Sequence, residues 1–148
     1  MAPLLFITGA SSGIGQALAA RYAQAGWRLA LVARRGALLQ QWCAEQGWPA
    51  SQWAVYEADV RDLAQIQAAA QACLQQQGVP DVVVANAGIS VGIDLSYEED
   101  LAVLKDLLDT NVLGLAATFQ PFIDAMKQRR SGYLVGMASV ASVRGLPG

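Results

Sequence analysis

The chain has 148 residues, of which 54% are hydrophobic and 15% are charged, and its formal net charge is −2. This composition excludes a disordered chain, and the length predicts a single domain, residues 1–148, with a sizeable core. The slightly negative charge indicates no nucleic-acid partner, and no apolar run reaches the length of a membrane span. The chain contains no histidine, which argues against a zinc site or a histidine-based triad.

Two features bear on the cellular compartment. The first residues, Met1-Ala2-Pro3, lack the basic region of a signal peptide. Cys43 and Cys73 fall within helical patterns and have no paired spacing, so we expect reduced thiols. Both features favour a cytoplasmic protein.

A glycine-rich turn follows the first apolar run, residues 4–7. The turn reads Thr8-Gly9-Ala10-Ser11-Ser12-Gly13-Ile14-Gly15, and a helical pattern starts within it. Backbone N–H groups at a helix start lack internal partners and carry partial positive charge, and glycine lets a pyrophosphate approach them. The turn therefore predicts a dinucleotide site, shaped by its three glycines, with the N–H groups near Gly13 and Ile14 facing the phosphates. Ser11 and Ser12 either hydrogen-bond the phosphates or cap the helix.

Short, nearly continuous apolar runs recur along the chain, at residues 4–7, 29–32, 53–56, 82–85 and 133–137. Such runs are typical of strands buried on both faces of a parallel sheet, and helical patterns lie between them. This alternation predicts an α/β fold, a Rossmann-type doubly wound parallel sheet with strand order 3-2-1-4-5. A ligand is then expected at the carboxyl ends of strands 1 and 4, where the winding reverses.

Polar residues, glycines and a proline mark the expected helix ends. Asp62 with Gln65, and Ser96 with Glu99, each resemble a capping box at a helix start. Glycines stand where three helices are expected to end: Gly26, Gly47 and Gly78. The fourth helix is expected to continue to about residue 127, with a kink or a break at Pro121.

Five motifs in chain order resemble those of the ordinary, non-extended short-chain dehydrogenases/reductases. They are Thr8-Gly9-Ala10-Ser11-Ser12-Gly13-Ile14-Gly15, Asp59-Val60, Ala85-Asn86-Ala87-Gly88, Asn111 within Asp109-Thr110-Asn111-Val112-Leu113-Gly114, and Ser139 within Met137-Ala138-Ser139-Val140. The similarity extends over essentially all 148 residues. It implies the same doubly wound fold, and it adds a nicotinamide cofactor and a hydride-transfer reaction.

The resemblance implies cofactor contacts for the residues that follow strands 3 and 4. Asp59 would meet the adenine edge, and Val60 would line the adenine pocket. Asn86, Ala87 and Gly88 would lie beside the nicotinamide ribose, where their small size would let the cofactor pass closely.

Arg34 and Arg35 follow the second strand, where the adenosine ribose is expected. A site for NAD usually carries an acid there for the ribose 2′-hydroxyl, whereas an arginine accommodates the 2′-phosphate of NADP. No acid occurs in Ala33-Arg34-Arg35-Gly36. NADP is therefore favoured over NAD, with either arginine as the phosphate contact.

The resemblance also implies catalytic roles for Ser139 and Asn111. Ser139 would hydrogen-bond the reacting oxygen of the substrate, and Asn111 would help hold a water and a lysine in a proton relay. The family's Tyr-x-x-x-Lys pair would fall past Gly148. We therefore expect the proton donor beyond this chain and expect the 148 residues alone to be inactive.

Together these features predict an NADP-dependent oxidoreductase that interconverts a carbonyl and a secondary alcohol on a small-molecule substrate. Members of the family are often dimers or tetramers, so a homodimer or homotetramer is expected. The alternative is a non-catalytic nucleotide-binding or regulatory protein of the same fold.

Overall fold

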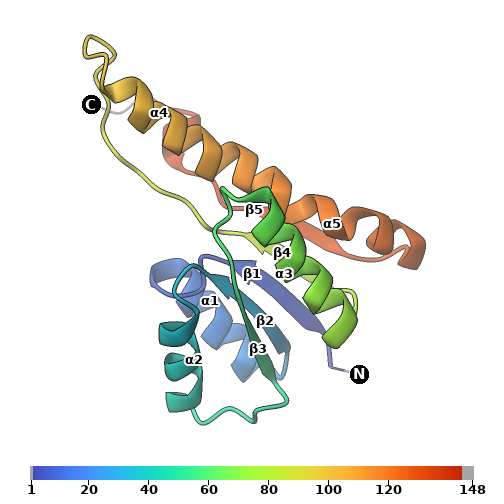
Figure 1. Ribbon diagram of the computed structural model, residues 1–148. Coiled ribbons are helices and arrows are strands. Elements are labelled where there is room, and N and C mark those ends of the chain that lie inside the picture. Colours follow the sequence, from blue (N-terminus) through green and yellow to red (C-terminus); the bar gives the residue numbers. More distant parts are fainter. Residues whose placement is uncertain (1, 145–148) are drawn as a thin grey trace.

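The computed structural model describes residues 2–144, with a five-stranded parallel sheet at its centre (Figure 1). The strands are β1 (Leu4–Thr8), β2 (Arg28–Ala33), β3 (Trp53–Glu57), β4 (Val82–Ala85) and β5 (Tyr133–Gly136). They lie in the order β3-β2-β1-β4-β5, and every pairing is parallel. The predicted fold class and strand order are confirmed.

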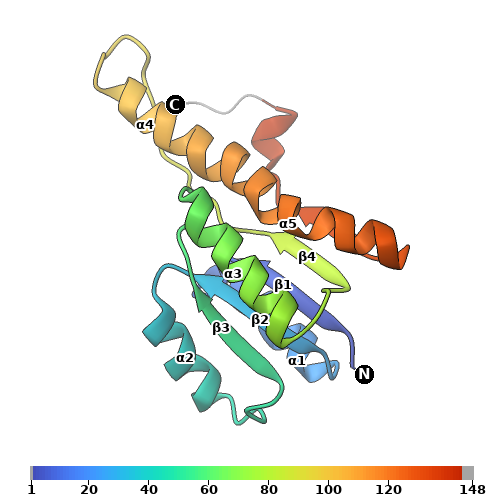
Figure 2. The same cartoon turned by 45° about the vertical axis from the view of Figure 1, so that its right-hand side comes forward.

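Helices cover both faces of this sheet. They are α1 (Gly13–Gln24), α2 (Gly36–Glu45), α3 (Leu63–Gln76), α4 (Asp100–Leu108) and α5 (Gly114–Arg129). A π-helical segment, η1 (Asp109–Leu113), joins α4 to α5, and a short 3₁₀ turn, η2 (Val140–Ser142), follows β5. Helices α1 and α2 lie on one face of the sheet, and α3 and α5 lie on the other (Figure 2).

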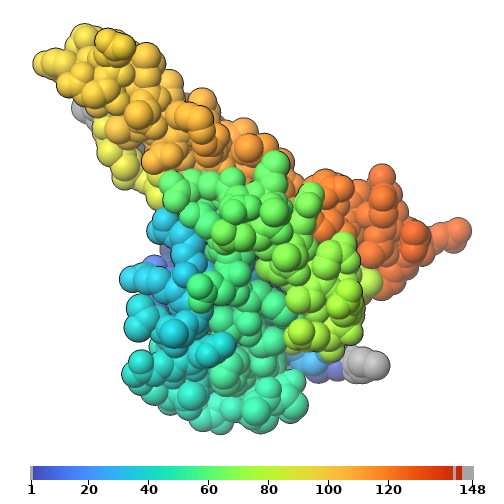
Figure 3. Space-filling model, in the orientation of Figure 1, coloured from blue at the N-terminus to red at the C-terminus, as the bar shows by residue number. Residues whose placement is uncertain are grey.

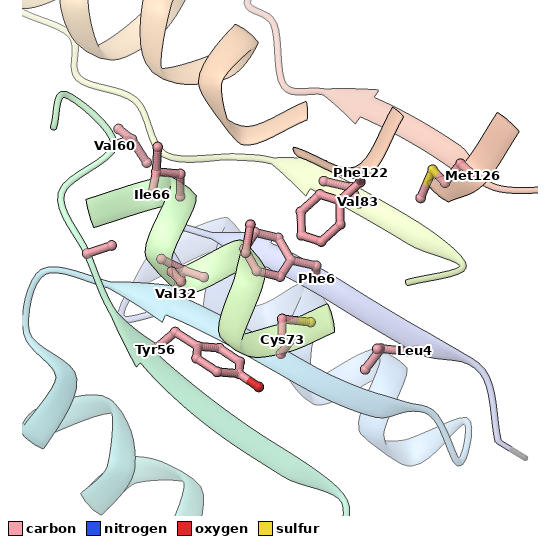
Figure 4. Packing of buried hydrophobic residues seen from close by; sticks show 14 residues of the cluster. Leu4, Phe6, Val32, Tyr56, Val60, Ile66, Cys73, Val83, Phe122 and Met126 are labelled. Atoms are coloured by element: carbon pink, nitrogen blue, oxygen red, sulfur yellow. The ribbon is translucent and has the colours of Figure 1, made fainter. Parts of the chain in front are cut away.

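The side chains of β1 alternate between two hydrophobic clusters, one on each face of the sheet. Leu4 and Phe6 point toward α3 and α5, where the Phe6 and Phe122 rings lie 4.7 Å apart (Figure 4). Leu5 and Ile7 point toward α1 and α2. Because both faces of β1 are buried, the strand is apolar at successive positions instead of at every second one.

The two cysteines are free thiols and are buried on opposite faces of the sheet, Cys73 among the side chains of the first cluster and Cys43 in the second. Burial raises the pKa of Cys43 to about 11 and that of Cys73 to about 12. Both thiols are therefore protonated at neutral pH and unsuited to act as nucleophiles.

Asp62 caps the start of α3 as predicted, but the reciprocal bond of a capping box is not made. Asp62 Oδ1 accepts hydrogen bonds from the backbone N–H groups of Ala64 (3.0 Å) and Gln65 (3.1 Å). The Gln65 side chain donates to Asp62 Oδ2 over 2.9 Å, whereas the backbone N–H of Asp62 bonds to the carbonyl of Asp59 over 3.0 Å. The two bonds to Asp62 Oδ1 satisfy N–H groups that have no partner inside the helix.

The capping box predicted at Ser96 and Glu99 is wrong. Ser96 donates both its backbone N–H (3.0 Å) and its hydroxyl (2.7 Å) to the Asp94 carboxylate. Helix α4 begins at Asp100, after Glu99, which makes no side-chain cap bond. The Asp94 carboxylate, two residues earlier, accepts both hydrogen bonds from Ser96. Ser96 therefore closes a local turn and does not cap the start of α4.

The glycine signals for helix ends are confirmed, since Gly26, Gly47 and Gly78 follow α1, α2 and α3 with positive φ. The long helix behaves differently from the prediction, because α5 continues through Pro121 without a break. Its irregular turn lies earlier, at η1, where the N–H of Gly114 bonds to the carbonyl of Asp109 five residues before.

Strand β5 and helix α4 contain no buried residue. All four residues of β5 are exposed, and Tyr133 is exposed by 72%. Helix α4 has no buried residue, and together with the loop before it projects beyond the sheet (Figure 3). Within residues 2–144, no helix is long and apolar enough to cross a membrane.

Candidate functional site

A cavity of about 530 Å³ lies at the carboxyl ends of β1, β2, β3 and β4. This is the edge of the sheet where the winding reverses between β1 and β4. The predicted cofactor residues that line it are Gly9, Ser11, Ser12, Ile14, Arg34, Arg35, Asp59, Val60, Asn86, Ala87 and Gly88. The fold therefore brings residues from four separate strand ends to one cavity.

The glycine-rich turn packs tightly against the end of β4. A Cβ at Gly15 would lie 2.2 Å from the Gly9 carbonyl oxygen, and a Cβ at Gly9 would lie 2.8 Å from the Cα of Ala87. Both distances are far shorter than a van der Waals contact, so only glycine fits at these two positions. Gly13 and Gly15 lie outside the lining of the cavity and shape the turn beside it.

The N-terminus of α1 is open to the cavity. Ser12 precedes the helix, but its side chain makes no cap bond, and the first turn of α1 contains no acidic residue. Ile14 lines the cavity and is exposed by 61%. The N–H groups and positive end of this helix are therefore available to an anion, and the capping role considered for Ser12 is not found.

Thr8 and Asn86 hold the ends of β1 and β4 together at the floor of the cavity. The backbone N–H groups of Asn86 and Ala87 each donate to Thr8 Oγ1 over 3.2 Å. The Asn86 side-chain amide donates to the carbonyls of Thr8 (3.1 Å) and Gly9 (3.3 Å). These bonds keep the Asn86-Ala87-Gly88 segment directly against the glycine-rich turn.

Arg34 and Arg35 line the cavity from the end of β2, and both side chains are exposed. Among residues 2–144, neither guanidinium has an ion-pair partner. The loop that carries them is fixed at its far end, because the N–H of Gly36 donates to Glu57 Oε2 over 3.1 Å. The two charges are thus free to meet an anionic ligand.

Asp59 is held by Arg61, a residue that the sequence analysis did not single out. Arg61 Nη2 lies 2.8 Å from Asp59 Oδ2, and Arg61 Nε lies 3.2 Å from each carboxylate oxygen. The hydrogen bond from the Arg61 side chain is the main cause that holds the pKa of Asp59 below its ordinary value. Arg61 Nη1 also lies 3.6 Å from Asp106 Oδ1 on α4.

Asn111 and Ser139, the predicted catalytic residues, are not in the lining of the cavity. Asn111 lies in η1, where its side chain accepts from the N–H of Ile89 (2.9 Å) and donates to the carbonyl of Ile89 (2.8 Å). Since Ile89 lines the cavity, Asn111 fixes the backbone at its rim. Ser139 follows β5, and its Oγ accepts from the N–H of Ala141 over 3.2 Å.

Some lining residues lie outside the predicted set of cofactor contacts and catalytic residues: Val32, Ala33, Ala58, Arg61, Ile89, Asp106 and Thr110. Val32, Ala33 and Ala58 lie at or just after strand ends, so their place follows from the topology. Asp106 and Thr110 come from α4 and η1, and no local pattern indicates that these segments reach the end of β3. Arg61 had one sequence signal, its position two residues after Asp59.

The comparisons with known proteins identify the family. A family model for the short chain dehydrogenases matches residues 4–148. The chain belongs to the short-chain dehydrogenase family. This assigns it to a family of oxidoreductases with a Rossmann-type nucleotide-binding fold and agrees with the motifs that the sequence carries.

Individual relatives support the same family. The chain is 39% identical over 151 residues to mouse 17-beta-hydroxysteroid dehydrogenase type 1, an alignment that spans 97% of this chain and 43% of the relative. It is similar to the crystal structure of a short-chain dehydrogenase from Streptomyces avermitilis, with a TM-score of 0.89, 31% identity, and coverage of 100% of this chain and 53% of that one.

A second structure is that of an alcohol dehydrogenase from the archaeon Thermococcus sibiricus complexed with 5-hydroxy-NADP. Its TM-score is 0.87 and its identity is 31%, with coverage of 99% of this chain and 62% of that chain. The chain spans about half the length of the curated relatives it matches.

Proposed function

We propose that this chain is the cofactor-binding part of an NADP-dependent oxidoreductase that interconverts a carbonyl and a secondary alcohol on a small organic substrate. The observation that carries the proposal is the cavity at the reversal of the sheet. There an uncapped helix N-terminus and two arginines that have no ion-pair partner within residues 2–144 face one space. An anion that carries a pyrophosphate and a separate phosphate matches these two sources of positive charge.

The residues of the cavity fit a nicotinamide dinucleotide. The N–H groups at the start of α1 would hold the pyrophosphate, and Arg34 or Arg35 would bind the 2′-phosphate. Asp59 and Val60 would contact the adenine, and Asn86, Ala87 and Gly88 would lie along the nicotinamide ribose. The bound nicotinamide supplies or accepts the hydride.

Names of similar proteins support NADP as the cofactor. The Thermococcus sibiricus structure is a complex with 5-hydroxy-NADP, and an Arabidopsis thaliana relative, 31% identical over 135 residues, is an NADPH-dependent pterin aldehyde reductase. In the proposal, Ser139 hydrogen-bonds the reacting oxygen and Asn111 supports a proton relay. The 148 residues contain no Tyr-x-x-x-Lys pair of the family motif.

The proposal extends to assembly and location. Apolar side chains exposed on α4 and η1, among them Leu101, Leu108 and Val112, suit a contact between subunits. We propose a homodimer or homotetramer located in the cytoplasm.

Calorimetric titration with NADPH and NADH tests the cofactor assignment. We expect NADPH to bind about tenfold or more tightly than NADH, and the double variant Arg34→Gln/Arg35→Gln to lose this preference because it removes both guanidinium groups. Arg21→Gln/Lys127→Gln is a charge-matched control, since Arg21 on α1 and Lys127 on α5 are exposed and lie outside the cavity lining. A wild-type protein that binds neither nucleotide would contradict the proposal.

Turnover is measured separately, on the longer polypeptide if the gene encodes one. NADPH oxidation with a panel of aldehydes and ketones is the expected activity. Binding of NADPH without turnover of any carbonyl would instead support the non-catalytic nucleotide-binding alternative.

A further inference from the structure

Arg61 lies in the connection between β3 and α3 and lines the same cavity as Arg34 and Arg35. Its guanidinium forms a fork with Asp59, with Nη2 to Oδ2 at 2.8 Å and Nε to both carboxylate oxygens at 3.2 Å. The backbone N–H of Arg61 adds a fourth bond, to Asp59 Oδ1 at 3.0 Å. Few side-chain pairs on the described surface are bound at so many points, and this geometry fixes the direction of both groups.

The bonds between Arg61 and Asp59 affect the balance of charge in the cavity. The lining carries Arg34, Arg35 and Arg61 as cations and Asp59 and Asp106 as anions. Asp59 interacts electrostatically with Arg34, one of the two arginines proposed to bind phosphate. An unbalanced carboxylate at Asp59 would oppose that binding, because it would attract Arg34 and repel an incoming phosphate dianion.

A proton does not remove this negative charge. The Arg61 hydrogen bonds lower the pKa of Asp59, so the carboxylate stays ionised at neutral pH. Its side chain is also partly shielded from water, being 22% exposed, which weakens solvent screening of the charge. The balance therefore depends on a fixed neighbouring cation, and Arg61 is the residue in contact.

We propose that Arg61 is a positioning residue for cofactor specificity: it offsets the charge of Asp59, so that the cavity accepts the 2′-phosphate of NADP while Asp59 still faces the adenine. This inference rests on the proposed function, since it concerns how the same cavity selects its cofactor. It assigns the preference for NADP to Arg34 or Arg35, which meets the phosphate, and to Arg61, which offsets the repulsion between Asp59 and that phosphate.

A competing role for Arg61 is purely mechanical. Arg61 also approaches Asp106 of α4 at 3.6 Å, so it could hold α4 against the β3–α3 connection. A mechanical role would affect both cofactors alike, because NADP and NAD differ only at the 2′-position. The ratio of the two dissociation constants separates the roles.

The experiment is calorimetric titration of NADPH and NADH into the wild-type protein and four variants. Arg61→Gln removes the cation, Arg61→Lys keeps the charge but loses the fork, and Asp59→Asn/Arg61→Gln removes both charges. Arg21→Gln removes one exposed positive charge outside the cavity lining and matches the change in net charge. Circular dichroism and thermal melting check that each variant is folded.

We expect Arg61→Gln to reduce the preference for NADPH over NADH about tenfold, mainly because the variant binds NADPH more weakly. The Asp59→Asn/Arg61→Gln variant should return the preference to within about twofold of the wild type, even if both nucleotides bind more weakly. Arg61→Lys and Arg21→Gln should leave the preference nearly unchanged. Should Arg61→Gln fail to fold, Asp59→Asn replaces it. We expect Asp59→Asn to raise the preference for NADPH, because it removes the opposing carboxylate and leaves Arg61 as a cation, and an unchanged ratio would contradict the inference.

Two results would overturn the inference, and they are distinguishable. If Arg61→Gln weakens NADPH and NADH equally, or the double variant does not restore the ratio, Arg61 acts mechanically and the proposed function stands. If the wild-type protein binds neither nucleotide, or binds them equally, the proposed function or its cofactor assignment fails first, and this inference fails with it.

Discussion

Strands β1 and β5 have similar sequences and opposite environments. Both are short and mainly apolar, Leu-Leu-Phe-Ile-Thr in β1 and Tyr-Leu-Val-Gly in β5. All five residues of β1 are buried between β2 and β4 and beneath helices on both faces. All four residues of β5 are exposed, and within residues 2–144 this strand pairs with β4 alone. An apolar run therefore predicts that a strand forms, but burial depends on which elements lie around it.

The same contrast divides the candidate site. The residues that line the cavity follow β1, β2, β3 and β4, which are fixed by hydrogen bonds such as those between Thr8 and Asn86. Ser139 follows the exposed strand β5 and lies outside the lining. The part of the molecule proposed to bind the cofactor, around β1 to β4, is thus packed more tightly than the part around β5.

The largest expected difference in the free energy of unfolding is between two truncated side chains, one in β1 and one in β5. Phe6→Ala should lower the free energy of unfolding by about 3–5 kcal/mol, because Phe6 is fully buried against Phe122 and a cavity would remain. Val135→Ala in β5 should cost less than about 1 kcal/mol, since Val135 is exposed by 40%. Urea denaturation followed by circular dichroism measures both, and equal losses would contradict the comparison.

Replacing one glycine beside β1 and one glycine in β5 is expected to give a second, smaller difference in stability. Gly15→Ala should destabilise the protein by about 1–3 kcal/mol and weaken NADPH binding, because the new Cβ would meet the backbone oxygen of Gly9 at 2.2 Å. Gly136→Ala in β5 should change stability by less than about 0.5 kcal/mol. Its Cβ would lie 3.0 Å from the end of the flexible Leu115 side chain and at an ordinary contact distance, 3.9 Å, from the Phe119 ring.

Thermal melting and calorimetry of these two variants provide the test. The comparison would fail if Gly136→Ala proved as damaging as Gly15→Ala, because that would mean the packing around β5 is as rigid as that around β1.

The smallest expected difference in the free energy of unfolding is between a residue that caps α3 and a residue that precedes α4 without capping it. Asp62→Ala should cost about 1 kcal/mol, because it leaves two N–H groups at the start of α3 without partners. Ser96→Ala should stay within about 0.5 kcal/mol, since Ser96 bonds to Asp94 and does not cap α4. Chemical denaturation of both variants measures the two losses in the free energy of unfolding. A larger loss for Ser96→Ala than for Asp62→Ala would mean that Ser96 does cap α4.

Much of the site was predictable because its residues stand next to local patterns. The glycine-rich turn and the Asn86-Ala87-Gly88 segment each directly follow an apolar strand, and parallel strands bring their carboxyl ends to the same edge of the sheet. The fork between Arg61 and Asp59 was not predicted, because the positions of two charged residues in a loop do not fix the direction of their side chains.

The sequence by itself determined the family, the parallel sheet and its strand order, since these depend on short apolar runs, glycine spacing and motifs that are local in the chain. Only the tertiary structure decided that Asp106 of α4 approaches Arg61, that Ser96 bonds to Asp94, and that β5 is exposed while β1 is buried. These features depend on contacts between segments far apart in the chain, or on competition between nearby hydrogen-bond acceptors. Such contacts are settled only when the whole chain is packed.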